Sequence, residues 1–159
     1  MAADPGVDFD EIYVGHAARL VRLAALLGAE DPEDVTQEAF CRLYAARARV
    51  REPELVAYLN RIVVNEVRSR ARRHRTAVGK RHLLGVSDVA PAPTGDRTAV
   101  LAELARLPQR QREALVLRYW LDLPFEQVAE SMGVATGTAR SQVSRGLQAL
   151  AIALDEEDG

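Results

Sequence analysis

The spacing of apolar residues constrains this chain more than any other feature. Apolar residues recur every three or four positions almost throughout its 159 residues, and the abundant Ala, Leu, Arg and Glu favour helices. No segment alternates in the way that a half-buried strand would. A cluster of glycines and prolines breaks the helical pattern between about residues 76 and 96. We therefore predict an all-α fold of two small helical domains joined by a flexible linker, the second ending in a helix-turn-helix.

The predicted boundaries place a first domain at residues 1–75, a linker at 76–96, a second domain at 97–154 and a disordered acidic tail at 155–159. The first domain is expected to hold helices over about 8–27, 32–46 and 54–75. Asp31 is suited to cap the second of these, with Pro32 at its first position. The second domain is expected to hold four helices, two of which begin at Pro108 and Pro124.

The segment LPFEQVAESMGVATGTARSQVSRGLQAL, residues 123–150, has the pattern of a helix, a tight turn and a second helix. Gly133 supplies the turn, because glycine takes a positive φ without steric cost. Thr136 is predicted to cap the following helix. The predicted inner side chains are Val128, Ala129 and Met132 on the first helix, and Ala139, Val143, Leu147 and Leu150 on the second.

The outer face of that second helix carries short polar and arginine side chains. A compact helix pair that presents such side chains is built to enter a DNA major groove. The alternative is an ordinary helical hairpin with a solvated outer face. The predicted DNA contacts of this segment are Thr138, Arg140, Ser141, Ser144 and Arg145.

The long helix of the first domain carries a basic stripe made of Arg61, Asn65, Arg68, Arg72 and Arg75. Spacings of three and four residues place these side chains on one helical face, opposite the apolar Leu55, Leu59, Ile62, Val63 and Val67. Fixed arginines suit a phosphate backbone, and an asparagine can read a base edge. An arginine-rich solvated face is the alternative. Glu66 lies on the apolar side, where we expect it to pair with Arg70.

Other functional classes find little support in the sequence. It has no phosphate-binding glycine loop, metal motif or nucleophile elbow, so we expect neither enzyme activity nor a cofactor or metal. Cys41 is the one cysteine, and we expect it to be a small buried side chain rather than a redox sensor. No apolar run reaches the length of a membrane helix and no signal peptide is visible, which favours a cytoplasmic protein without membrane insertion.

The two DNA-facing patterns, in this order across a linker, resemble the extracytoplasmic-function (ECF) sigma factors of bacterial RNA polymerase. Three segments of the first domain resemble successive parts of region 2 of this family: FDEIYVGHAARLVRLAALL (region 2.1), DPEDVTQEAFCRLY (region 2.2) and YLNRIVVNEVRSRARR (the helix that spans regions 2.3 and 2.4). The segment that begins LPQRQREALVLRY and runs through the helix-turn-helix resembles region 4.

This resemblance implies roles that composition alone does not indicate. The acidic helix would dock on core RNA polymerase, whereas its charges by themselves suggest only a solvated face; its candidate contacts are Asp34, Gln37, Glu38 and Arg42. The loop before the long helix would capture a flipped base of the minus-ten promoter element, with Arg47, Arg49 and Arg51 as candidate contacts. The basic stripe would hold the opened strand, and region 4 would read the minus-thirty-five duplex. The resemblance also implies control by an anti-sigma factor.

Two other hypotheses compete with a promoter-specificity subunit. A stand-alone helix-turn-helix regulator would need a dimer and a palindromic site. Its dimerisation face would be apolar, which the basic stripe is not. A protein-interaction module, acting as a titrating partner, would use the acidic helix and the apolar part of the linker.

Overall fold

The computed structural model of this protein describes residues 8–82 and 96–159, and these residues form helices and connecting turns without a strand. The first domain consists of α1 (Phe9–Leu26), α2 (Pro32–Ala46), the 3₁₀ turn η1 (Glu52–Glu54) and α3 (Leu55–His82). The second consists of α4 (Asp96–Arg106), α5 (Gln109–Leu115), the π-helical turn η2 (Val116–Trp120), α6 (Phe125–Met132) and α7 (Thr136–Glu157). The predicted all-α, two-domain fold is confirmed.

Aspartates cap the first two helices of the first domain, and the cap by Asp31 is the predicted one. Asp8 accepts a hydrogen bond from the backbone N–H of Asp10, and Asp31 accepts one from that of Asp34 at 3.0 Å, with Pro32 in the first turn. Gly28 ends the α1 segment with a φ of 95°, which glycine adopts at little cost. The loop is therefore tight enough for α1 and α2 to pack side by side.

The first domain buries the apolar side chains that the sequence pattern predicts. Those of α2 and α3 are Val35, Ala39, Phe40, Leu43, Leu55, Leu59, Ile62, Val63 and Val67. Phe9, Tyr13 and Phe40 add an aromatic cluster, with the Phe9 and Phe40 rings nearly perpendicular. Arg19 of α1 donates to Asn60 of α3 at 2.8 Å, which joins these two helices through a polar contact.

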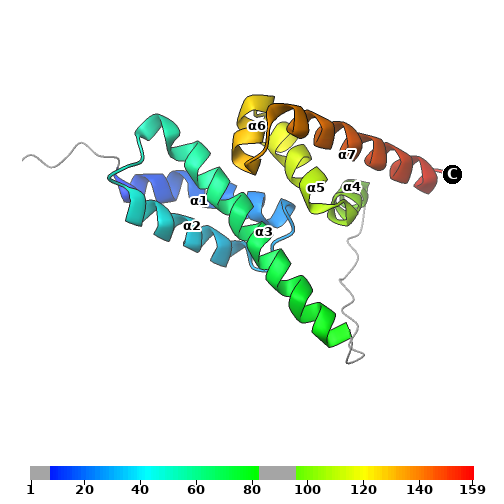
Figure 1. The fold of residues 1–159 in the computed structure, drawn as a ribbon, viewed down its shortest axis with the longest axis horizontal. Helices are drawn as coiled ribbons and strands as arrows, with labels where there is room; N and C mark the ends of the chain where they lie inside the picture. Colours follow the sequence, from blue (N-terminus) through cyan, green and yellow to red (C-terminus); the bar gives the residue numbers. More distant parts are fainter. Residues whose placement is uncertain (1–7, 83–95) are drawn as a thin grey trace, which may run out of the picture.

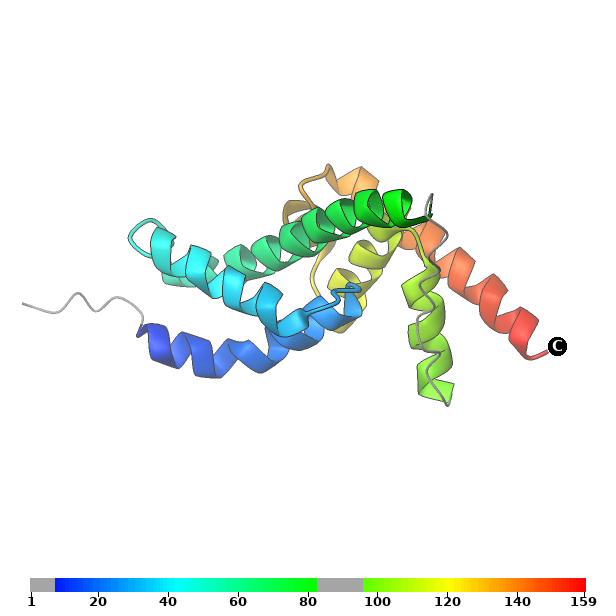
Figure 2. The ribbon, with the colours of Figure 1, turned by 90° about the horizontal axis from the view of Figure 1, so that it is seen from below.

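The two domains pack against each other through α3. In both ribbon views α3 lies between the α1–α2 pair and α6 (Figures 1 and 2). Buried residues of α3, α5, α6 and α7 belong to one continuous apolar cluster. The helix-turn-helix therefore packs directly against α3, the helix that carries the basic stripe.

Several boundaries differ from the predicted ones. The helix predicted to end at residue 75 continues to His82, since Ala, Lys and Arg in this stretch favour helix and outweigh one glycine. The rest of the predicted linker, residues 83–95, lies outside the described residues. The acidic end is helical through Glu157, so our expectation of disorder from residue 155 is wrong for this part of the tail.

Three individual predictions are also corrected. Ala135 rather than Thr136 is the N-cap residue of α7, and no side chain caps this helix end. Leu147 is 43% exposed, because α7 turns Gly146 rather than Leu147 toward α5. Cys41 is exposed on α2, since Phe40 and Leu43 take the inward positions of that turn.

Candidate nucleic-acid interface

The outer face of α7 is open to solvent. Gly133, in the left-handed conformation with φ 70°, turns the chain between α6 and α7. Val128, Met132, Ala139 and Val143 are buried and fix the two helices against each other. The five side chains predicted to contact DNA are all exposed: Thr138, Arg140, Ser141, Ser144 and Arg145. Their short hydroxyls and long guanidinium groups give this face donors at two different reaches.

The basic stripe of α3 lies on the predicted face, but its members differ in their surroundings. Arg61, Asn65, Arg72 and Arg75 are exposed. Arg68 instead donates two hydrogen bonds to Glu113 of α5, at 3.0 and 2.7 Å, and a third to the Met132 carbonyl. The Glu113 side chain is fully buried. One predicted DNA contact is therefore engaged by the second domain.

Glu113 is not among the residues predicted from the sequence. It precedes Val116 and Leu117 by three and four residues, so helical spacing places it on the buried side of α5. A carboxylate on a buried face requires a cationic partner. That spacing is the signal that could have predicted a buried ion pair, although it does not reveal that the partner belongs to the other domain.

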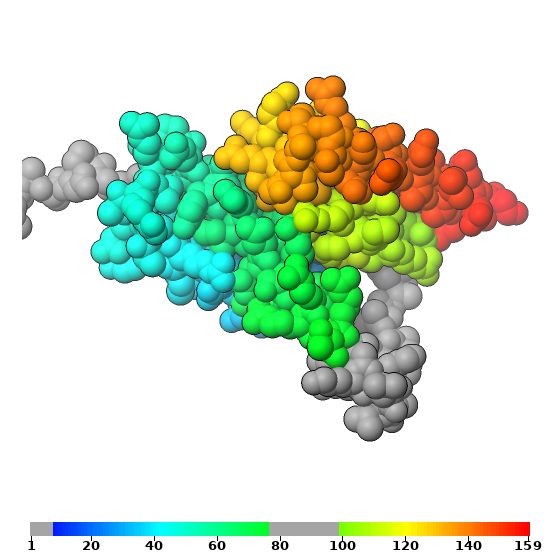
Figure 3. Space-filling view, in the orientation of Figure 1, coloured from blue at the N-terminus to red at the C-terminus, as the bar shows by residue number. Residues whose placement is uncertain are grey.

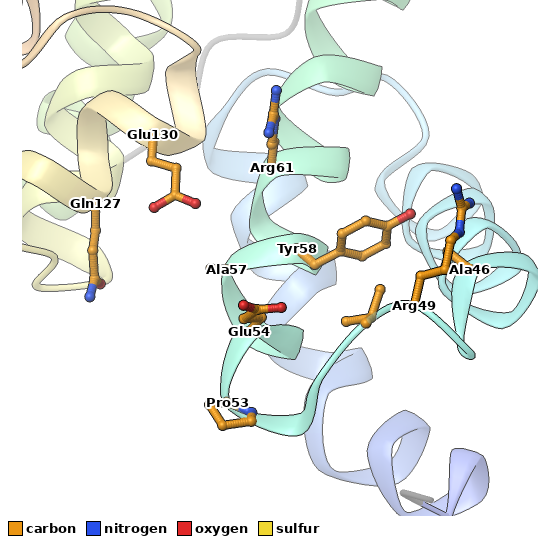
Figure 4. Close-up of a pocket in the computed structure, with 10 residues that line it drawn as sticks. Ala46, Arg49, Pro53, Glu54, Ala57, Tyr58, Arg61, Gln127 and Glu130 are labelled. Carbon is orange, nitrogen blue, oxygen red and sulfur yellow. The ribbon is translucent and has the colours of Figure 1, made fainter.

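A cavity of about 810 Å³ lies beside the loop that precedes α3. Arg49, Val50, Pro53 and Tyr58 line it from the first domain, and Gln127 and Glu130 of α6 form its opposite wall (Figure 4). The structure places Arg49 and Arg61 at this cavity, and Arg51 at the exposed end of the same loop. Arg47 is turned toward Tyr44, with its guanidinium 3.9 Å from the ring centroid.

The predicted docking residues lie together on α2, where contacts within this helix and to α1 and α3 hold them. Arg42 bonds to Glu38 at 3.0 Å and to Glu66 at 2.9 Å. Asp34 bonds to Arg70 at 2.6 Å, and Gln37 donates to the Tyr13 hydroxyl. These contacts orient the four side chains along one side of α2.

Glu66 joins α2 and α3 in this network, because it is buried and accepts from both Arg42 and Arg70. The predicted Glu66–Arg70 pair is present at 2.8 Å. The hydrogen bond from Arg70 to Glu66, together with the contacts of Arg70 to Asp34, raises the pKa of Arg70 above its ordinary value. The network thus keeps Arg70 firmly charged.

Arg112 makes a second link between the domains. Its guanidinium donates to the Leu27 carbonyl at the end of α1 and to the carbonyls of Leu104, Ala105 and Leu107 around the end of α4. Burial lowers the pKa of Arg112, with Glu113 opposing this shift. The Arg112 side chain therefore donates to carbonyls at the ends of two helices that belong to different domains. These carbonyls have no partner within their own helices.

Comparison with known proteins agrees with this arrangement. The family Sigma-70 region 2 matches residues 12–77, and the family Sigma-70, region 4 matches residues 97–150. The ECF RNA polymerase sigma factor SigM of Mycobacterium tuberculosis is 34% identical over 156 residues, which cover 90% of this chain and 75% of SigM. The chain belongs to the ECF sigma factors.

Other relatives of this sigma factor agree in sequence and fold. The ECF RNA polymerase sigma factor SigE of Mycolicibacterium smegmatis is 31% identical over 154 residues, covering 89% of this chain but only 60% of SigE. The sigma factor RpoE of Bartonella quintana, in a structure with the anti-sigma factor NepR, superposes with a TM-score of 0.79. It is 26% identical, and the match covers 93% of this chain and 97% of that one.

Residues 8–82 and 96–159 of this sigma factor were compared with the requirements of a metal site and of a membrane-spanning helix. No three His, Cys, Asp or Glu side chains in these segments lie close enough together to hold a metal ion. No helix in them combines the length and the apolar character that crossing a membrane requires.

Proposed function

We propose that this protein binds core RNA polymerase in the bacterial cytoplasm, recognises two promoter elements and assists promoter opening, without catalysing a reaction itself. The single observation that carries this proposal is the placement of two exposed basic helical faces, on α3 and α7, in two domains that match regions 2 and 4. Residues 1–75 would serve the minus-ten element and polymerase, and residues 97–154 the minus-thirty-five element.

On the first domain, the α2 face of Asp34, Gln37, Glu38 and Arg42 would contact polymerase. Arg61, Asn65, Arg72 and Arg75 would hold the opened strand, and Arg68 would join them once released from Glu113. Arg47, Arg49 and Arg51 would contact the strand at the loop. The cavity beside this loop is large enough for a base and contains Tyr58, which supports capture of a flipped base by stacking.

On the second domain, Thr138, Arg140, Ser141, Ser144 and Arg145 would read the minus-thirty-five duplex. Their exposure on a helix fixed by its partner helix supports this assignment, since a recognition helix needs a rigid seat. Control by an anti-sigma factor is supported by the similarity to Bartonella quintana RpoE, which forms such a complex.

Run-off transcription tests the proposal. Purified protein and bacterial core polymerase are mixed on a template that carries the upstream region of the protein's own gene, with core alone as the control. A discrete transcript that requires the protein is the expected result. Specific binding of the protein alone to a palindromic site, without core binding, would instead support a stand-alone regulator.

A further inference from the structure

Five arginines from both domains line one cavity where α3, α5 and α7 meet. The cavity has a volume of about 470 Å³. Its wall consists of Arg68, Arg72 and Arg75 of α3, Pro108, Gln109, Arg110 and Gln111 at the start of α5, and Gln142 and Arg145 of α7. Figure 3 shows the surfaces of α3 (green), α5 (yellow-green) and α7 (orange) adjoining on one face of the molecule.

The charges around this cavity are strongly unbalanced. Among the described residues that line it, none is a carboxylate. Glu113 lies behind it, where it pairs with Arg68 at 2.7 Å and lies 3.6 Å from Arg110. One carboxylate thus faces five guanidinium groups. Like charges held together in a concave surface repel one another and create a positive potential that attracts anions.

Three of the five arginines have unused hydrogen-bonding capacity. Among the described residues, Arg72, Arg75 and Arg145 make no ion pair, and their side chains are exposed. The amides of Gln111 and Gln142 add neutral donors to the same wall, whereas the Gln109 amide already donates to the Leu27 carbonyl and to Glu113, each at 3.5 Å. The site therefore offers several donors for which the part of the chain that the structure describes supplies no acceptor.

The chemistry of the wall selects the class of ligand. Guanidinium groups bind phosphate through paired hydrogen bonds, and five arginines carry more positive charge than a single phosphate can balance. A cavity of about 470 Å³ has the size of a small-molecule site. We propose that it binds a compact anion with two or more linked phosphates, such as inorganic polyphosphate or a nucleotide polyphosphate, and that this anion holds the two domains together.

Isothermal titration calorimetry of the full-length protein with sodium tripolyphosphate, in about 50 mM salt to limit screening, tests this proposal. We expect binding of one anion per protein. Arg72→Ala and Arg145→Ala, which act from different domains, should each weaken it about tenfold. Gln142→Glu, which places a carboxylate in the wall, should weaken it at least as much.

Arg22→Ala is the matched control, since Arg22 is an exposed arginine of α1 that lies outside this cavity and outside the predicted DNA-binding residues. Its affinity for tripolyphosphate should equal that of the wild type. Equal losses in Arg22→Ala and Arg72→Ala would show diffuse attraction and overturn the site, as would absence of binding to the folded wild type. Circular dichroism confirms that each variant is folded.

Two further ligands identify the source of the phosphates. Tighter binding of a nucleoside triphosphate than of tripolyphosphate would support a nucleotide ligand, and equal binding would support the phosphate chain alone. A single-stranded oligonucleotide that binds more tightly than either, with the same sensitivity to Arg145→Ala, would overturn the proposal in favour of a nucleic-acid surface. No polymerase is present in these titrations, so their failure is distinguishable from failure in run-off transcription.

Discussion

The two surfaces predicted to face DNA differ in how far other parts of the protein contact them. On α7 all five predicted contacts are exposed, and the helix is held from behind by Ala139 and Val143. On α3, the second domain engages Arg68, and α6 forms one wall of the cavity that Arg61 lines. The predicted recognition face of α7 is thus exposed in the free protein, whereas on α3 the bonds of Arg68 to the second domain would have to break before the whole stripe could bind DNA.

This difference shows what the spacing of residues on a helix determines. Spacing fixes the side of the helix on which a residue lies. It does not determine which partner occupies that side. Arg68 and Arg72 lie on the same face four residues apart, yet one is bonded to a buried carboxylate and the other is exposed.

The strongest test of the free α7 surface is the double substitution Arg140→Ala with Arg145→Ala. Each base contact of this kind is worth about 1–3 kcal/mol, so we expect run-off transcription from a promoter with both elements to fall at least tenfold. Binding to core polymerase, measured by gel filtration, should not change. Arg106→Ala on α4 removes an arginine outside this face and should have no effect; loss of core binding in the double variant would contradict the assignment.

The engaged α3 surface is tested by Arg68→Ala against Arg72→Ala. Removing Arg68 leaves the buried Glu113 carboxylate without its main partner, which should cost about 3–5 kcal/mol of stability. Arg72 is exposed, so its loss should change the free energy of unfolding by less than about 0.5 kcal/mol. Urea denaturation of the three proteins measures both values. Similar stabilities for the two variants would mean that the Arg68–Glu113 pair contributes little.

Substitutions at two glycines of α7 test how closely the rest of the second domain packs against this helix. A Cβ atom added at Gly146 would lie 2.8 Å from Cδ1 of Leu115, so Gly146→Ala should destabilise the protein by about 1–3 kcal/mol. A Cβ atom at Gly137 meets nothing within 4 Å, so Gly137→Ala should stabilise the helix by about 0.5–1 kcal/mol. Thermal unfolding should shift in opposite directions for the two variants; a shared direction would refute the packing described for α7.

The smallest expected effect concerns His16, a partly buried residue of α1. Burial, and to a lesser degree the charge of Arg19, lowers the pKa of His16 below its ordinary value of 6.5. The unfolded chain then binds the proton more readily than the folded one, so stability should fall as the pH drops through about 6.5. We expect His16→Gln to show a smaller decrease between pH 8 and pH 5.5 in urea denaturation. An unchanged decrease would show that His16 does not contribute.

Much of the fold could be predicted because it depends on local patterns. The buried faces of α2, α3 and α6, the Asp31 cap and the turn at Gly133 follow from helical spacing and from the conformational freedom of glycine. The exposed face of α7 was predictable for the same reason. The end of α3 was not, because the preference of Ala, Lys and Arg for helix outweighs Gly79, which we had treated as a break.

The contacts between the domains could not be predicted in this way. The Arg68–Glu113 pair joins residues 45 positions apart, and Arg112 reaches a carbonyl 85 positions away. Local spacing carries no information about which distant helix a charged side chain will meet. For the same reason, the sequence suggested two separate basic surfaces and not the arginine-lined cavity that Arg72 and Arg145 share.

The tight turn at Gly28 carries a constraint imposed by the other domain. Its positive φ disfavours a side chain, and an added Cβ atom would also collide with the Arg112 guanidinium bonded to Leu27. The two positions should therefore vary together in evolution: in relatives with a larger residue at position 28, we expect a shorter side chain at position 112. Such paired changes would leave a record in sequences of how the two domains were packed in their common ancestor.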